Sequence, residues 1–414
     1  MMTSTFGWLD HDDGERRRMM ELIDVFREKS ILDELGLGTI RDTYAEYFFP
    51  GTSTIQTRAR YFLFIPWLYR QLEDEHVPSH RAAARARELQ WKLVQSLKGG
   101  GTRDGQGVIG YEAGENLQRL PSSIYWWGLR RWGIRRFDGS IEQYHAALDT
   151  WYVDMRAPRS SEGGELVATG RHNWRETLPL PPAGWLESTD FALRQEEAEF
   201  LTERIIQDCP GTLLAATLNP KVTRVKRSQA PWDLGGLDIL EDQLRQDLED
   251  ARRFSLGMLG ANRLYNLMLV RLQEDQGMVA SPGRVDRFQA SFAAWAEEVA
   301  AEHIALAAWD RESMWRRLLQ LNPRIRPNAI RFSDTWLARM IEDPFSAADD
   351  EQIQALIKRR ERLLKGSLAR LSNPRALEKW VGAPGGGGML YRWLDAKALV
   401  VDILNGLHQP VGEA

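Results

Sequence analysis

The sequence predicts a mainly α-helical fold, built from many helices in two subdomains with few short strands. Apolar residues recur every three or four positions over long stretches, which is the spacing of one face of a helix. No clean series of alternating apolar and polar residues marks a set of strands. The length of 414 residues exceeds what one core needs, which favours two or more domains.

Capping residues and apolar spacing locate the first helices. Asp12 or Asp13 is expected to cap a helix that runs to about Lys29. A later helix fits Ala82–Leu97, where leucines recur every four residues. A glycine-rich loop at 99–114 follows this helix.

The run 61–69 is the longest apolar stretch, and it follows a Pro-Gly turn. Ser53 or Thr54 is expected to cap the helix that contains this run together with Arg58 and Arg60. Free N–H groups at such a helix start would favour an anion, which either arginine could support. The alternative is an arginine held beneath the core by carbonyls or a buried acid.

The rest of the chain continues the helical pattern. Further helices are expected as a pair within Pro121–Trp151 and then at Gln195–Asp208, Phe254–Leu272, Arg284–Trp309, Glu351–Leu371 and Met389–Leu407. A stretch rich in Pro, Gly and Ser interrupts them at 155–186. We therefore expect an N-terminal helical domain at 1–154, an irregular linker or insertion at 155–186, and a C-terminal helical domain at 187–414.

Composition excludes several classes of protein. Apolar residues at 43% and charged residues at 27% fit a globular chain and exclude wholesale disorder. The net charge of −4 excludes a chain that is basic overall. One cysteine excludes an internal disulfide framework. With no secretory signal and no apolar run near the roughly 20 residues of a membrane span, a cytoplasmic protein without a membrane partner is expected.

No motif identifies a catalytic residue, a metal or a cofactor. Gly105–Gly110 matches G-x-G-x-x-G, but that fingerprint needs a preceding strand and a following helix, so a surface loop is expected. His76 and His80 could hold a metal from a loop, although two solvated histidines are the simpler interpretation. Asp10–Asp13 is explained by helix capping, and Cys209 by packing. The site prediction therefore contains no catalytic and no metal-binding residue.

Basic residues gather in three stretches, 117–136, 221–227 and 357–375. The first holds five arginines and no acid, interleaved with four aromatic residues. Arginine matches phosphate geometry and aromatic rings stack on bases, so such mixtures suit nucleic acid. The alternative is that the tryptophans, 16 in the whole chain, fill a core while the arginines pair with acids elsewhere.

The segment Phe49–Phe62, with the sequence FPGTSTIQTRARYF, resembles the signature of a bacterial family catalogued only as a domain of unknown function. Phe6–Leu9, Gly36–Arg41, Gly260–Asn266 and Tyr391–Trp393 look like the same family. The resemblance covers most of the chain. It implies a bacterial, cytoplasmic protein encoded among anti-phage genes, and it implies no catalytic residue.

We therefore expect a non-enzymatic accessory component of a bacterial anti-phage defence system that binds DNA or a DNA-processing protein partner. The residues predicted to bind nucleic acid are Arg58, Arg60, Arg130, Arg131, Arg135 and Arg136. One alternative is a metal-dependent nuclease or other hydrolase, with carboxylates such as Asp10 and Asp402 gathered from distant segments. Another is a pure protein scaffold with tryptophans at an interface.

Overall fold

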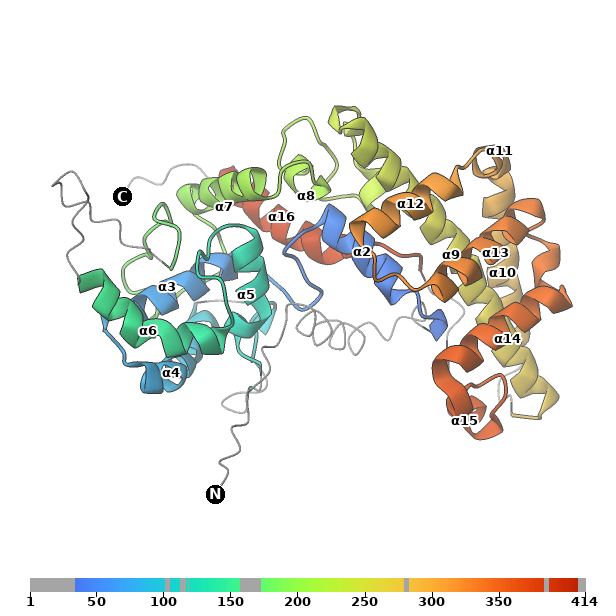
Figure 1. The fold of residues 1–414 in the computed structure, drawn as a ribbon, viewed down its shortest axis with the longest axis horizontal. Coiled ribbons are helices and arrows are strands. Elements are labelled where there is room, and N and C mark those ends of the chain that lie inside the picture. Colours follow the sequence, from blue (N-terminus) through green and yellow to red (C-terminus); the bar gives the residue numbers. More distant parts are fainter. Residues whose placement is uncertain are drawn as a thin grey trace, which may run out of the picture. The chain divides into compact units, whose positions relative to one another are not determined.

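The regular structure of the chain is helical. The computed structural model describes residues 34–100, 105–111, 117, 119–156, 173–278, 283–382 and 387–408. Within these ranges every regular element is a helix (Figure 1). Extended pairing there is limited to two isolated bridges, Arg135–Trp174 and Thr223–Gly235. The predicted mainly α fold is confirmed.

The chain divides into two compact units, each assembled from segments that are distant in sequence. Unit 1 comprises Met1–Tyr44 and Gln246–Tyr391, and unit 2 comprises Ala45–Arg245 and Arg392–Ala414. The sequence-based division with a linker at 155–186 stays a prediction, and much of that linker lies outside the described residues. The helix expected to run to Lys29 lies outside them as well.

Unit 2 is organised around α3, in which every residue of the apolar run 61–69 is buried. Its ring systems pack closely, for example Phe62 on Trp132 with centroids 3.8 Å apart. Helix α3 packs on α4 and α5, α4 packs on α6, and α7 packs on α16. The helices of this unit are α3 (Tyr61–Asp74), α4 (Ser79–Gly99), α5 (Pro121–Arg131), α6 (Ile141–Arg156), α7 (Gln195–Asp208), α8 (Leu213–Ala216) and α16 (Trp393–Leu407).

Unit 1 is organised around α9 (Asp242–Asp275), whose first residues belong to unit 2. Trp295 and Trp336 are fully buried and donate their indole N–H groups to the α9 carbonyls of Leu256 and Gly257. The other helices are α10 (Arg284–Ala301), α11 (His303–Ala307), α12 (Arg311–Leu321), α13 (Pro327–Glu342), α14 (Glu351–Lys365) and α15 (Pro374–Glu378). Helix α2 (Gly38–Phe48) is shared by the two units.

Several helix boundaries differ from the prediction. Ser53 and Thr54 cap no helix, because the backbone stays irregular until α3 begins at Tyr61. The helix expected over Arg284–Trp309 is interrupted at Glu302 and continues as the short α11. Helix α14 ends at Lys365, where Gly366 with a φ of +55° turns the chain. None of the described helices combines the length and apolar character that a membrane span requires.

Candidate nucleic-acid interface

The 49–62 segment starts as an irregular, buried stretch of unit 2 and leads into α3. Gly51 has a φ of +78°, and a Cβ at this position would lie 2.8 Å from Nε1 of Trp132. The Gln56 side chain accepts a hydrogen bond from the Ser53 N–H and donates one to the Gly51 carbonyl. A buried loop must satisfy its own backbone groups, which explains the glycine and the small polar residues.

Arg58 forms a bidentate ion pair inside unit 2. Its Nε and Nη2 atoms lie 2.9 Å from the two carboxylate oxygens of Asp402 on α16. The Ala59 N–H donates to the same carboxylate, and the guanidinium lies 4.7 Å from the ring centroid of Phe191. Asp402, the carboxylate suggested for a nuclease, is therefore engaged by Arg58, and its suggested partner Asp10 lies outside the described residues.

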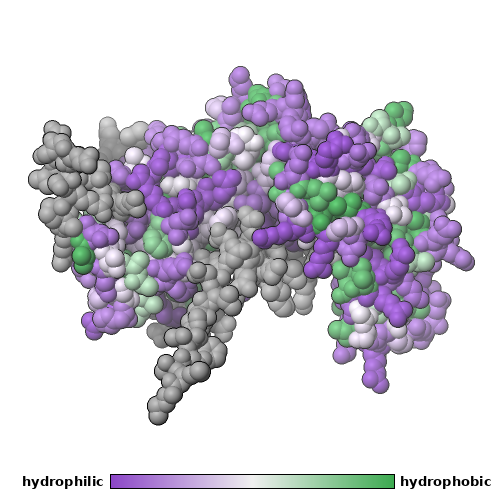
Figure 2. Space-filling view, viewed as in Figure 1, coloured by the Kyte–Doolittle hydropathy of each residue, from purple (hydrophilic) through white to green (hydrophobic). Residues whose placement is uncertain are grey.

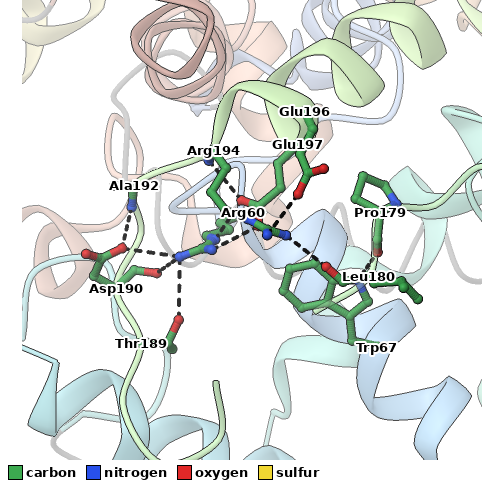
Figure 3. A network of polar contacts seen from close by, with 10 residues as sticks. All are labelled: Arg60, Trp67, Pro179, Leu180, Thr189, Asp190, Ala192, Arg194, Glu196 and Glu197. Atoms are coloured by element: carbon green, nitrogen blue, oxygen red, sulfur yellow. Dashed lines mark hydrogen bonds and ion pairs between the residues drawn. The ribbon is translucent and has the colours of Figure 1, made fainter. Parts of the chain in front are cut away.

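Arg60 is buried at the centre of a polar network in unit 2 (Figure 3). Its Nε and Nη2 atoms lie 2.9 Å from the two oxygens of Glu197 on α7, whose side chain is fully buried. Nη1 donates to the carbonyl and the carboxylate of Asp190 at 3.1 and 3.2 Å. Arg194 adds a second cation to Glu197 at 2.8 Å. The alternative of an arginine held by carbonyls and a buried acid is the one observed.

Three arginines of the 117–136 stretch that reach the surface have acidic or carbonyl partners, whereas Arg119 is exposed and makes no ion pair or side-chain hydrogen bond among the described residues. Arg130 pairs with Asp138 at 3.3 Å, and Arg136 pairs with Glu176 at 2.9 Å. Arg131 donates to a backbone carbonyl at the end of α7, at 2.9 Å. Exposed pairs of this kind are weak and exchange with solvent, so Arg130 and Arg136 remain accessible to an anion.

Arg135 and the neighbouring tryptophans form part of the core of unit 2. The Arg135 guanidinium lies 4.5 Å from the ring centroid of Trp126 and donates to the carbonyls of Phe137 and Gly139. Trp126 and Trp132 are buried. Arg60 and Arg135 thus lie in the interior, and the six predicted arginines do not share one exposed face. Their contact with nucleic acid stays a prediction.

The 357–375 stretch in unit 1 contains one basic residue that anchors the start of the described chain. Arg360 on α14 is buried and donates to the carbonyls of Leu35 and Gly36 at 2.8 and 3.0 Å. Burial, together with the nearby charge of Arg326, lowers the pKa of Arg360. Arg326 immediately precedes α13, so a second cation lies close to the buried side of α14.

Two further basic residues of this stretch belong to an internal network. Lys365 and Arg370 both pair with Glu34, the latter at 2.7 Å. The fully buried Glu361 accepts hydrogen bonds from the Tyr265 hydroxyl at 2.6 Å and from the backbone N–H of Arg370 at 2.8 Å. Burial and the Glu361 contact raise the pKa of Tyr265, which keeps its hydroxyl protonated as a donor. These cations therefore stabilise the fold.

The remaining basic residues of α14 form the basic face, which consists of Lys358, Arg359 and Arg362. All three side chains are exposed and, within the described ranges, none makes an ion pair or a side-chain hydrogen bond. Their spacing places them on the side of the helix opposite its buried residues. Exposed leucines continue from the end of this face, Leu363 at 61% and Leu368 at 69% exposure. Figure 2 shows this as a hydrophobic area in hydrophilic surface over the end of α14 and α15.

The third basic stretch, 221–227 in unit 2, is also at the surface. Lys221, Arg224 and Arg227 are exposed, and Lys226 is exposed and hydrogen-bonded to Asn405 at 2.6 Å. This loop belongs to unit 2, whereas the basic face belongs to unit 1.

Nothing in the described residues forms an evident catalytic group. Cys209 is buried, and burial raises the pKa of its thiol to about 11, which disfavours the nucleophilic thiolate. No group of three or more His, Cys, Asp or Glu side chains in that part of the chain is placed to hold a metal ion. The described surface instead offers unpaired cations.

Comparison with known proteins identifies a matching family but assigns no activity to it. The model of one family, described as "Family of unknown function (DUF6361)", matches residues 3–405. No curated protein and no solved structure matches the chain.

Proposed function

The chain belongs to this family of unknown function, and from that premise we propose that it binds nucleic acid as a non-enzymatic accessory protein of bacterial anti-phage defence. The basic face of α14 contacts the phosphate backbone. DNA is the expected polymer, and a DNA-processing protein is the expected partner in the defence system.

The observation that carries this proposal is the contrast within one helix. Arg360 and Lys365 are held by carbonyls and carboxylates of unit 1. Lys358, Arg359 and Arg362 extend into solvent with no carboxylate to neutralise them in the described chain. Three such charges on one helical face suit an extended polyanion, such as a phosphate backbone, better than a single point ligand. Contacts of this kind position a protein on DNA without reading its sequence.

The proposal is tested by the salt dependence of DNA binding. Each neutralised phosphate contributes about −0.9 to the slope of log affinity against log salt, so three contacts give about −2.7. Binding through the basic face alone would weaken about 40-fold between about 50 and 200 mM salt. Fluorescence anisotropy with labelled duplex and single-stranded DNA measures the slope on the full chain.

The decisive variant replaces Lys358, Arg359 and Arg362 by Gln, which preserves helix propensity at exposed positions. The slope of log affinity against log salt should be about 2.7 less steep in this variant than in the wild-type chain. The matched control replaces Arg245 and Arg316 by Gln, two exposed arginines outside the predicted set that already have carboxylate partners. If the slope is unchanged in the first variant, or is lost only in the control, the basic face does not bind DNA. No binding at about 50 mM salt would refute the proposal as a whole.

The defence role needs a separate test in cells. Bacteria that carry the gene with its neighbouring genes are challenged with phage, and plaque numbers are compared between wild type and the Gln variant of the basic face. Plaques should rise with the variant while the level of the protein stays the same. Equal plaque numbers with and without the whole gene would contradict a role in defence.

A further inference from the structure

The 221–227 loop of unit 2 is a basic surface that the proposed function does not use. It lies between α8 and α9 and has the sequence KVTRVKR (Figure 1). Lys221, Arg224 and Arg227 recur at every third residue, and all three are exposed. Within the described ranges none of them makes an ion pair or a side-chain hydrogen bond. Three uncompensated positive charges therefore meet solvent in one short loop.

The residue that follows each of these cations is buried. Val222 and Val225 are 6% and 5% exposed, and Ser228 is 4% exposed. The Ser228 carbonyl accepts a hydrogen bond from Lys397 Nζ of α16 at 2.9 Å. Burial of these three residues attaches the loop to unit 2 and leaves the cations at the surface.

Hydrogen bonds hold the loop near both of its ends. Thr223 and Gly235 exchange two hydrogen bonds between backbone N–H and carbonyl groups, at 3.0 and 3.1 Å. Lys226 Nζ donates to Asn405 Oδ1 of α16 at 2.6 Å. A loop that is already ordered in this way loses little conformational freedom when a ligand binds, which lowers the cost of binding.

Arg224 has an unusual backbone conformation. Its φ is +63°, in the left-handed region that glycine adopts freely and other residues rarely occupy. Its side chain lies against Gly235, where a Cβ would be 3.1 Å from Arg224 Nε. Because glycine would fit position 224 without strain, backbone stability does not account for the arginine. An exposed cation in a strained conformation indicates a binding role.

We propose that Lys221, Arg224 and Arg227 bind the phosphate backbone of duplex DNA, as a second contact besides the basic face. This inference rests on the proposed binding of DNA. The loop contains no aromatic residue, so it offers no ring on which an unpaired base of a single strand would stack. Its contacts are those of cations with phosphates, which position a protein on DNA without reading the sequence.

The test measures the salt dependence of DNA binding by fluorescence anisotropy on the full chain. With three loop contacts added to those of the basic face, the slope of log affinity against log salt should be about −5.4. The loop variant replaces Lys221 and Arg227 by Gln, and its slope should be about 1.8 less steep than that of the wild type. Single-stranded DNA of the same length should bind more weakly, and tighter binding of the single strand would overturn the assignment to duplex.

The matched control replaces Lys92 and Arg245 by Gln. Both are exposed cations of unit 2, both already have carboxylate partners, and the change in net charge is the same as in the loop variant. The slope of the control should equal that of the wild type. An unchanged slope in the loop variant, or an equal loss in the control, would overturn the inference.

Arg224→Gly separates binding from stability. Its slope should be about 0.9 less steep than that of the wild type. Its midpoint in urea should not fall, because glycine adopts the left-handed conformation without strain. A lower midpoint with an unchanged slope would show that Arg224 supports the loop and does not bind DNA.

The Gln variant of the basic face distinguishes the two claims about DNA. If that variant alone changes the slope, the proposed function stands and the loop inference is wrong. If the loop variant alone changes it, the loop binds DNA and the basic face does not. If neither variant changes the slope, both assignments are wrong.

Discussion

The buried pair of Arg60 and Glu197 gives the sharpest prediction about stability. Glu197→Leu should lower the free energy of unfolding by about 3 to 5 kcal/mol, because removing one member of a buried pair leaves the other charge without compensation. Leucine has a similar volume, so the loss does not come from a cavity. After the substitution, the nearest anion for Arg60 is Asp190, whose side chain is 56% exposed.

The magnitude follows from the contacts that are lost. Both oxygens of Glu197 receive Arg60 at 2.9 Å, and one of them also accepts the Arg194 N–H at the start of α7. Loss of that capping contact adds roughly 1 kcal/mol. The matched control is Asp190→Asn, which removes an exposed pair and should cost about 1 kcal/mol or less. The Asn oxygen can keep the hydrogen bond that Asp190 accepts from the Ala192 N–H.

Urea denaturation of the full chain measures these differences. Tryptophan fluorescence and circular dichroism are both followed, because two compact units need not unfold in a single transition. The double variant Arg60→Met/Glu197→Leu should be more stable than Glu197→Leu alone, since it leaves no buried charge behind. The reasoning is refuted if Glu197→Leu costs no more than Asp190→Asn, or if the double variant is the less stable.

Two further substitutions test electrostatics and packing. Because burial raises the pKa of Glu73, its proton stabilises the fold fully below the ordinary value of 4.5, and that contribution is lost as the pH rises through the folded pKa. Glu73→Gln should therefore make the free energy of unfolding fall less steeply above pH 4.5. Urea denaturation at a series of pH values measures this, and the same pH dependence in both proteins would contradict it. Gly260→Ala should cost about 1 to 3 kcal/mol, because the new Cβ would lie 2.0 Å from the Trp295 ring. Gly99→Ala meets no atom within 4 Å and should be neutral or stabilising, so equal losses at both glycines would refute the packing argument.

Helical spacing predicted the fold class because it depends on local sequence alone. Helix α7 was expected at Gln195–Asp208 and begins and ends at those residues. The interruption near Glu302 and the late start of α3 were not predicted, because both depend on contacts made by distant residues. Arg60, for example, was placed inside a helix, whereas its ion pair with Glu197 joins positions 137 residues apart.

For the same reason, the sequence could not distinguish arginines that lie in the interior from arginines that lie at the surface. Arg135 and Arg136 are neighbours in one basic stretch, yet one is buried on Trp126 and the other is exposed. The basic face could have been recognised more easily. Lys358, Arg359 and Arg362 alternate with the buried Ile357 and Arg360 at helical spacing, so the polar side of α14 was open to prediction. The hydrogen bonds that hold Arg360 to backbone carbonyls could not be predicted from the sequence.

The 49–62 segment shows why a distinctive motif need not mark a functional site. Thr57 donates to the Gly107 carbonyl at 2.7 Å, the Tyr125 hydroxyl receives two N–H groups of the segment, and Arg58 and Arg60 reach α16 and α7. The side chains of Thr57, Arg58 and Arg60 therefore link this segment to other parts of unit 2. Substitutions in the segment should consequently reduce stability, whereas those on the basic face should reduce binding of nucleic acid and leave stability unchanged. A variant of Arg58 that folds with wild-type stability but fails to bind DNA would reverse this assignment.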